Sequence, residues 1–197
     1  PVVIAQGRVH YYEGYTMDEV TYPVRLMKGL GTHSLIITNA SGTANKEFPP
    51  GDLMIVTDQI NWMFNNPLAG HRINISNSKL YDDEYIALAE RAAEELGINI
   101  RKGILIASTG PSYETPAEVR IMKKLGGDGI CMSTVPEVLV ARSLNIRVLG
   151  ISCLTNYAAG LTQHTLDHSE VTEMATRIKE PFAALLFKII ELMGERC

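Results

Sequence analysis

Short apolar runs alternate with longer segments of helical period along most of this chain. The runs are rich in Val and Ile, which is typical of strands buried on both faces. The expected strands are Val2–Ala5, Ser34–Thr38, Leu53–Thr57, Gly103–Ala107, Gly129–Met132 and Arg147–Leu154. The expected helices are Met17–Leu30, Asp83–Leu96, Pro116–Leu125, Val135–Leu144 and Ser169–Met193, the last interrupted or bent near Pro181. This alternation predicts an α/β fold, a single domain with a central mixed, mainly parallel sheet flanked by helices.

Several helix ends carry boundary signals of their own. Thr115 followed by Pro116 is a favourable helix start, with Thr as the N-cap and Pro at the first helical position. Gly31, Gly97 and Gly126 follow three of the expected helices at the point where a left-handed cap falls. These signals support the helical assignments independently of the apolar period.

Composition bounds the size of the fold and its partners. The chain has 197 residues, 46% hydrophobic, which suits residues 1–197 forming one domain with a buried core. Eighteen Lys and Arg against 22 Asp and Glu give a net charge of −4. A mildly acidic chain has no field to hold a nucleic-acid backbone, so no nucleic acid is expected as a partner. No run approaches the roughly 18 apolar residues of a membrane span, so no membrane is expected either.

The number and spacing of the cysteines and histidines indicate the cellular compartment and whether a metal site is expected. Cys131, Cys153 and Cys197 are odd in number and lack metal-like spacing, which argues against a disulfide framework. Two of them lie in apolar runs, where a reduced thiol packs as a small hydrophobe, so a cytoplasmic location is expected. His164 and His168 are four residues apart, but the H-E-x-x-H pattern is absent, so no metal site is expected.

Polar clusters follow four of the expected strands, where ligands bind in mainly parallel sheets. The clusters are Arg8 with His10, residues 39–42, Ser133, and Thr155 with Asn156. They predict one shared pocket, although separate loop caps give a similar pattern.

The first two clusters suit anion binding. Arg8 offers a planar, permanently charged fork for phosphate oxygens, and His10 can donate beside it. A surface turn with a structural His fits the spacing equally well. Small residues in the stretch TNASG, residues 38–42, let a ligand approach backbone N–H groups, although a plain tight turn is the simpler interpretation.

The later clusters suit a heterocycle. Tyr113 can stack on a flat ring, and the adjacent Glu114 can accept hydrogen bonds from ring N–H groups. Alternatively, Glu114 only favours the dipole of the helix that follows. The amide of Asn156 can both donate to and accept from a purine edge, or it can simply form a turn. Met132 has the spacing of an ordinary core residue.

The chain contains, in this order, the stretches GRVHYYEGY, TNASG, NPLAG, GPSYETPAEV, CMSTVPEV, TNYAAG and HSEV. Several motifs in order are far more specific than any one of them. Together they resemble the purine nucleoside phosphorylase family, in its trimeric branch specific for 6-oxopurines. The resemblance therefore implies a nucleoside phosphorylase-like form of the predicted α/β domain.

The resemblance also implies roles for individual residues. The implied phosphate site consists of Arg8, His10, Ala40 and Ser133. The implied ribose contacts are Tyr12, Met132 and His168. The implied purine site contains Tyr113, Glu114 and Asn156, with Ser41 and Gly42 also beside the substrate. The catalytic roles fall to Asn156, Glu114 and His10.

The implied reaction is the reversible phosphorolysis of guanosine, inosine and their deoxy forms to the free base and (deoxy)ribose 1-phosphate. Inorganic phosphate is the co-substrate, no cofactor is implied, and the implied assembly is a homotrimer. Glu114 as a carboxylate only accepts, which matches N1–H of a 6-oxopurine and mismatches adenine. The related methylthioadenosine phosphorylases typically carry Asp at the position of Asn156 and are one alternative. A non-catalytic nucleoside-binding homologue is another.

The sequence departs from the family pattern in three places. The Gly-Ser-Gly and Gly-His-Ser-Gly loops that complete the family's phosphate site are not in the sequence, so we expect a half-built phosphate site and weak or absent turnover. The segment His71–Leu80 lacks the Phe that relatives extend into a neighbouring subunit. Ser41 stands where Ala is common, a change that should be tolerated.

Overall fold

A computed structural model describes residues 1–71, 79–162, 173–174 and 176–194. A short 3-10 helix, η1, precedes the first α-helix. In chain order the named elements are η1 (Tyr11–Glu13), α1 (Met17–Gly29), β1 (Ser34–Thr43), β2 (Leu53–Asn61), α2 (Asp83–Leu96), β3 (Ile100–Ala107), α3 (Pro116–Lys124), β4 (Gly129–Cys131), α4 (Val135–Ser143), β5 (Arg147–Tyr157) and α6 (Lys179–Gly194).

The five strands form one mixed sheet that closes on itself in the order β1-β4-β3-β2-β5. The pairs β1–β5, β2–β3 and β3–β4 are parallel, whereas β1–β4 and β2–β5 are antiparallel. The prediction of a mixed, mainly parallel sheet within an α/β domain is therefore confirmed. The closure of the sheet was not predicted, because it depends on pairings between strands that are far apart in the chain.

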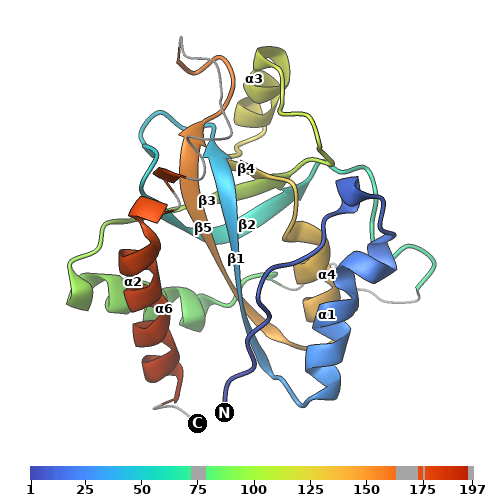
Figure 1. Ribbon diagram of the computed structural model, residues 1–197, viewed down its shortest axis with the longest axis vertical. Coiled ribbons are helices and arrows are strands. Elements are labelled where there is room, and N and C mark those ends of the chain that lie inside the picture. The colour runs from blue at the N-terminus through green and yellow to red at the C-terminus, as the bar shows by residue number, and fades with distance from the viewer. Residues whose placement is uncertain (72–78, 163–172, 175, 195–197) are drawn as a thin grey trace.

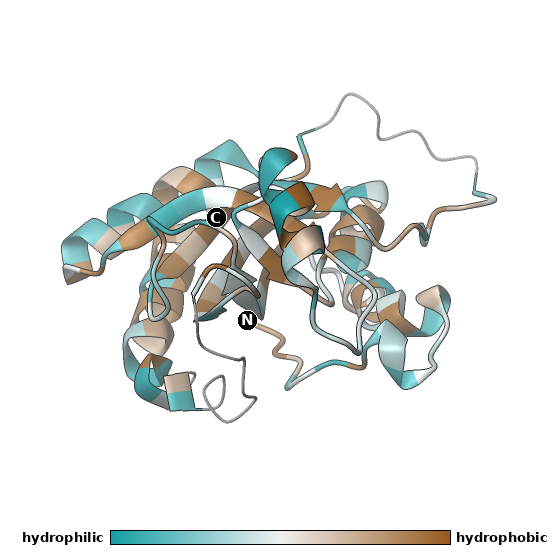
Figure 2. Cartoon of the chain, turned by 90° about the horizontal axis from the view of Figure 1, so that it is seen from above, coloured by the Kyte–Doolittle hydropathy of each residue, from teal (hydrophilic) through white to brown (hydrophobic). Residues whose placement is uncertain are grey.

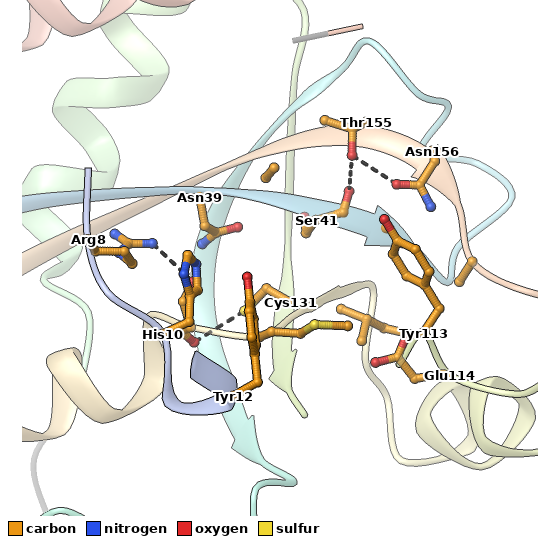
Figure 3. Close-up of a pocket in the computed structure, with 16 residues that line it drawn as sticks. Arg8, His10, Tyr12, Asn39, Ser41, Tyr113, Glu114, Cys131, Thr155 and Asn156 are labelled. Atoms are coloured by element: carbon orange, nitrogen blue, oxygen red, sulfur yellow. Dashed lines mark hydrogen bonds between the residues drawn. The ribbon is translucent and has the colours of Figure 1, made fainter. Parts of the chain in front are cut away.

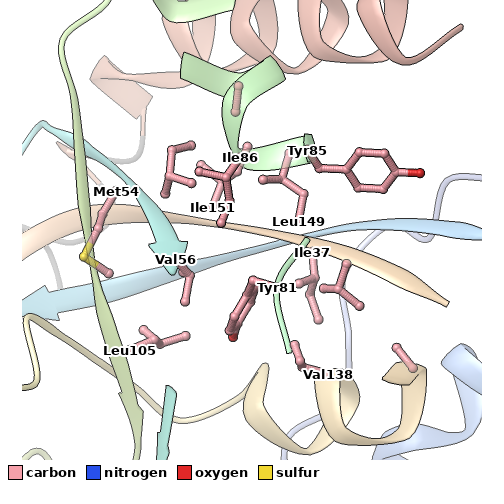
Figure 4. Packing of buried hydrophobic residues seen from close by; sticks show 14 of the residues in the cluster. Ile37, Met54, Val56, Tyr81, Tyr85, Ile86, Leu105, Val138, Leu149 and Ile151 are labelled. Carbon is pink, nitrogen blue, oxygen red and sulfur yellow. The ribbon is translucent and has the colours of Figure 1, made fainter. Parts of the chain in front are cut away.

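Helices cover the sheet on opposite sides, with α2 and α6 on one side and α1 and α4 on the other (Figure 1). The core lies where these helices meet the strands. Figure 4 shows Ile86 of α2 and Val138 of α4 reaching the sheet from its two sides, with Val56, Leu105 and Ile151 on the strands between them. Burial of this continuous apolar cluster is the main stabilising term, at about 25 cal/mol per Å² of apolar surface.

Three of the covering helices, α1, α2 and α6, are amphipathic, whereas residues 135–141 of α4 are all buried. In Figure 2 these three helices alternate between hydrophilic and hydrophobic positions along their length, as expected for elements with one face on a core. Among the residues that the structure describes, no helix combines the length and the apolar character needed to span a bilayer.

The predicted helix boundaries are mostly confirmed. Thr115 is the N-cap of α3, where its hydroxyl accepts from the backbone N–H of Glu118, and Pro116 is the first helical residue. Gly97 caps α2 in the left-handed conformation, with φ of 65°. The last predicted helix is interrupted before α6, by a turn at position 178, close to Pro181 as expected. Its predicted residues 169–172 and 175 lie outside the described residues.

The predicted strand Val2–Ala5 is wrong. Residues 1–7 form no regular structure and are exposed; Ile4, for example, is 81% exposed. β4 pairs with β1 only at Gly42 and Thr43, so most of that edge of β1 is open, yet residues 1–7 do not join it as a strand. Its Val and Ile content gives it a local preference for extended structure, but a strand forms only where another strand pairs with it.

Four of the predicted strands, β1, β2, β3 and β5, are longer than expected. β1 continues through Asn39 and Ser41 to Thr43, and β5 continues through Asn156 to Tyr157. The tight turn considered for residues 38–42 is therefore wrong, as is the placement of these polar residues beyond the strand ends. A register shift between Ser41 and Gly42 bends the strand pair at this point, and such bulges re-aim side chains next to functional sites.

A bidentate ion pair joins the start of α2 to the start of β5. Arg147 Nε and Nη2 each donate to one carboxylate oxygen of Asp82, both at 2.7 Å. Asp82 is also the N-cap of α2, accepting from the backbone N–H groups of Glu84 and Tyr85. The hydrogen bonds from Arg147 lower the pKa of Asp82, and burial partly opposes them.

Asp82→Asn should lower the free energy of unfolding at pH 7 by about 1 kcal/mol, because Asn still caps the helix but loses the ionic partner. The folded-state pKa of Asp82 is depressed, so this stability is present above about pH 4. It is lost as the pH falls below 3.8, through the folded-state pKa. Urea unfolding at pH 7 and at low pH measures both effects. Asp83→Asn, which alters an exposed pair with Lys79, is the matched control. If the free energies of unfolding of the wild type and Asp82→Asn differed by the same amount at both pH values, the ionic role of Asp82 would be contradicted.

Candidate active site

One cavity of about 210 Å³ lies against the bent ends of β1 and β5. All of the sequence-predicted site residues except one line it, and the exception, His168, lies outside the described residues. The lining residues are Arg8, His10, Tyr12, Asn39, Ala40, Ser41, Gly42, Tyr113, Glu114, Ile130, Cys131, Met132, Ser133, Thr155, Asn156 and Ala158. The prediction of one shared pocket is therefore confirmed, and separate loop caps are excluded.

The pocket has two chemically different ends (Figure 3). Arg8 and His10 lie at one end, and Tyr113, Glu114 and Asn156 lie at the other. A cationic fork therefore faces an aromatic ring, a carboxylate and an amide across a single cavity. This arrangement suits a ligand that carries an anion at one end and a flat polar ring at the other.

Arg8 is held on three sides by the protein. Its Nη2 donates to the carbonyl of Thr38 at 2.8 Å, and its Nη1 donates to Ser133 Oγ at 3.0 Å. Its Nε pairs with a carboxylate oxygen of Glu137 at 3.3 Å, and both side chains are largely buried. A guanidinium fixed at several atoms loses little entropy when it binds an anion.

His10 is oriented by Glu13 of η1. The Nδ1 atom of His10 lies 2.9 Å from Glu13 Oε1, and the His10 backbone N–H donates to the same oxygen. These hydrogen bonds lower the pKa of Glu13. The imidazole stacks on Tyr12 with ring centroids 4.9 Å apart. With Nδ1 paired to a carboxylate, Nε2 is the ring atom left to contact a ligand.

The polar groups at the Tyr113 end of the pocket are held by hydrogen bonds. Glu114 Oε1 accepts from Ser108 Oγ at 2.5 Å. Asn156 Oδ1 accepts from Thr155 Oγ1 at 2.9 Å, and its Nδ2 donates to the carbonyl of Tyr157 at 3.1 Å. Gly42 pairs with Asn156 across β1 and β5, where a Cβ atom would come within 3.2 Å of Nδ2. Glycine therefore leaves room for this amide.

Gly110 serves the pocket in a similar way. Its φ is +67°, and a Cβ atom there would lie 2.5 Å from Met132 Sδ and 2.8 Å from Tyr12 Cδ1. Any larger residue would displace both side chains from the pocket wall. The first glycine of GPSYETPAEV is therefore required by packing against Met132 and Tyr12, which the sequence pattern alone did not show.

Thr134 stands at the start of α4 in a strained conformation. Its φ is 68° and its ψ is −56°, and the N–H of Val135 donates to the carbonyl of Ser133 at 2.7 Å. This geometry is a γ-turn of the positive-φ kind, which is rare and costly for a β-branched residue. Its Oγ1 accepts from Asn39 Nδ2 at 3.0 Å. Such strain is concentrated at functional sites.

Sequence reasoning missed several residues of this site. Ile130, Cys131 and Ala158 line the pocket, and Glu137 supports Arg8 from behind. A signal existed for Glu137, because T-V-P-E repeats the Thr-x-x-Glu pattern that starts α3. Asn39 and Thr155 belong to the polar clusters that predicted the shared pocket, and both line it, although the sequence pattern gave neither an individual role.

Cys131 and Cys153 are free and buried, as predicted. Burial raises the pKa of the Cys131 thiol to about 11, and its Sγ donates to the carbonyl of Ser133 at 3.3 Å. Burial likewise raises the pKa of Cys153 to about 11. Both thiols therefore remain protonated at neutral pH and pack as apolar groups. Within the described residues, no group of three His, Cys, Asp or Glu side chains could hold a metal ion.

Ser41 carries a buried hydroxyl that has no hydrogen-bond partner among the described residues. Ser41→Ala should therefore raise the free energy of unfolding by about 1 kcal/mol, since an unsatisfied buried hydroxyl is costly. Ser133→Ala is the opposite case, because Ser133 Oγ accepts from Arg8, and it should destabilise. Urea unfolding of both variants measures the two signs. A loss of stability in Ser41→Ala would show that this hydroxyl is satisfied.

The closed mixed sheet, its helical cover and its two-ended pocket define an α/β protein of the nucleoside phosphorylase type. The chain belongs to the Phosphorylase superfamily, whose sequence model matches residues 1–191. Together with relatives named purine nucleoside phosphorylase, this match confirms the family that the seven stretches predicted. The chain is 50% identical over 195 residues to purine nucleoside phosphorylase 1 of Bacillus subtilis, covering 96% of this chain and 72% of the relative.

Solved structures agree with this assignment. A purine nucleoside phosphorylase of Schistosoma in complex with hypoxanthine superposes with a TM-score of 0.89 at 35% identity, over 94% of this chain and 71% of that one. The Schistosoma mansoni enzyme in complex with adenosine gives a TM-score of 0.88 at 36% identity, with 94% and 71% covered. The fold prediction is therefore confirmed by structural neighbours as well.

Proposed function

We propose that this chain is a purine nucleoside phosphorylase acting on guanosine, inosine and their deoxy forms. Phosphate attacks the anomeric carbon as the bond to the purine nitrogen breaks, giving the free base and (deoxy)ribose 1-phosphate. The observation that carries the proposal is that Glu114 and Asn156 share one cavity with Arg8 and His10. A base and an anion can therefore be held at the same time on either side of a ribose.

Base selection follows from the signs of the hydrogen bonds. Glu114 as a carboxylate accepts from N1–H of a 6-oxopurine, whereas adenine places a lone pair at that atom. A buried acceptor facing a lone pair is left unpaired, and such mismatches are rejected strongly in the transition state. The Schistosoma mansoni relative was solved with adenosine bound. Discrimination is therefore expected in kcat/KM rather than in binding alone.

The remaining groups serve the charges that develop during the reaction. Arg8, His10, Ser133 and the Ala40 backbone hold the phosphate in line, a contribution of positioning. Tyr12, Met132 and His168 contact the ribose, on which positive charge grows. Asn156 hydrogen-bonds N7 and O6 of the base, where negative charge grows, and so stabilises the transition state more than the substrate. Inorganic phosphate is the co-substrate, and no metal or organic cofactor takes part.

The working form is a cytoplasmic homotrimer, in keeping with the family branch that the motifs resemble. Sedimentation velocity would test the trimer, and a monomer at working concentration would contradict it.

The decisive experiment measures release of free base from inosine, adenosine and methylthioadenosine, each with and without phosphate. We expect phosphate-dependent cleavage of inosine and much lower kcat/KM for the other two. Cleavage that does not depend on phosphate, or a preference for methylthioadenosine, would overturn the proposal. Binding of hypoxanthine without turnover would favour a nucleoside-binding protein.

A further inference from the structure

Glu137 is a buried carboxylate directly behind the pocket. Its side chain is 8% exposed, and it does not line the cavity itself. A buried carboxylate is costly unless a cation and hydrogen-bond donors satisfy it. Both of its oxygens are engaged, and each contact leads to a different part of the candidate phosphate site.

The first oxygen fixes the orientation of Arg8. Glu137 Oε1 lies 3.3 Å from Arg8 Nε, while the carbonyl of Thr38 accepts from Nη2 at 2.8 Å. With these two edges of the guanidinium held, Nη1 is directed to Ser133 Oγ in the pocket wall at 3.0 Å. The anchor matters because residues 1–7 are exposed and form no strand, so the sheet does not hold this segment.

The second oxygen supports the strained turn. Glu137 Oε2 accepts from the backbone N–H of Thr134 at 3.0 Å, at the residue with φ of 68°. The same turn places Ser133 Oγ beside Arg8 and lets Thr134 Oγ1 accept from Asn39. One carboxylate therefore ties the cation of the N-terminal segment to the hydroxyls that precede α4.

We propose that Glu137 is a positioning residue for phosphate, acting through Arg8 and the Ser133–Thr134 turn. The inference rests on the proposed function, because it assigns Glu137 to the anion end of that site. Two other α-helices carry Glu at the same position after their N-caps: Glu19 of α1 and Glu118 of α3 accept from the backbone N–H groups of Thr16 and Thr115. Only Glu137 among these three also pairs with a pocket cation in the described structure.

The test compares Glu137→Gln with Glu19→Gln in inosine phosphorolysis. Gln can still accept from the Thr134 N–H, but its amide is a poor partner for Arg8 Nε. We expect the KM for phosphate to rise about tenfold while the KM for inosine changes less than about twofold. Glu19→Gln should leave both KM values unchanged. Titration of inorganic phosphate into each protein by calorimetry provides a readout independent of turnover.

A double-mutant comparison separates positioning from general stability. In the background of Arg8→Met, adding Glu137→Gln should cause no further rise in the KM for phosphate, because no guanidinium remains to be placed. The melting temperature of the double variant should exceed that of Arg8→Met, which leaves the carboxylate buried and unpaired. If Glu137→Gln does not fold, Glu137→Asp gives the same comparison, because its shorter side chain keeps the charge but withdraws it from Nε.

The outcomes are distinct. A wild-type chain with neither phosphate binding nor phosphate-dependent cleavage would overturn the proposed function, and this inference with it. A phosphate-dependent wild type whose Glu137→Gln variant keeps its KM for phosphate would overturn the inference alone. Equal rises in the KM for phosphate and the KM for inosine would assign Glu137 a general structural role and overturn the inference. A further rise in the KM for phosphate when Glu137→Gln is added to Arg8→Met would overturn it in the same way.

Discussion

Asn156→Leu is expected to lower kcat for inosine phosphorolysis by about a hundredfold to a thousandfold, a loss of about 3 kcal/mol of transition-state stabilisation. The reason is that the amide interacts with N7 and O6 most strongly when the leaving base carries its negative charge. Leucine keeps a similar volume, so the wall formed with Thr155 and Gly42 stays filled. Steady-state assays with inosine over a range of phosphate concentrations measure kcat and both KM values.

The control is Asn66→Ala. Asn66 is an exposed loop amide outside the pocket, and its removal should leave kcat unchanged. In Asn156→Leu the KM for phosphate should stay close to the wild-type value, because Arg8 lies at the other end of the cavity. A variant that keeps more than about a tenth of wild-type kcat would show that the amide is not the group that stabilises the leaving base.

Glu114→Gln is expected to lower kcat/KM for inosine by about a hundredfold, because a charge-assisted bond to N1–H becomes a neutral one and its geometry shifts. The amide can donate to the lone pair of adenine, so kcat/KM for adenosine should not fall. The ratio of kcat/KM for inosine to kcat/KM for adenosine therefore falls by at least as much as kcat/KM for inosine itself. Competition assays with both substrates in one solution measure that ratio directly.

Glu118→Gln is the matched control for this variant. It lies one turn further along, caps α3 through Thr115, and does not line the pocket. It should leave the inosine-to-adenosine ratio unchanged. If Glu114→Gln kept the wild-type ratio, the carboxylate would have no part in reading the purine, and its role would be the hydrogen bond that it accepts from Ser108.

Local signals predicted the parts of this fold that local physics decides. The start of α3 at Thr115-Pro116 and the left-handed cap at Gly97 depend on residues within one turn, and both are confirmed. The run Val2–Ala5 has a strand composition without a strand partner, so composition misled. The closure of the sheet depends on pairs such as Ser34 with Arg147, which no local pattern reports.

The site shows the same division. The ordered stretches assigned eleven of the sixteen pocket residues through family resemblance, and the structure brings them together. The polar residues Asn39 and Ser41 resemble turn formers locally, yet β1 carries them inside the sheet because β5 pairs with them along its length. Glu137 was overlooked because its partner Arg8 is far away in sequence and no spacing rule connects them. The assignment of His168 remains a prediction.

The pairing of β1 with β5 also affects how fast the chain folds. β1 lies early in the chain, and its parallel partner begins at Arg147, after three other strands and three more helices have been synthesised. Bringing such distant segments together costs loop-closure entropy before any contact compensates for it, which slows folding. During that interval the apolar faces of β1 and β2 are uncovered, so a chaperone that shields nascent strands should raise the yield of native protein.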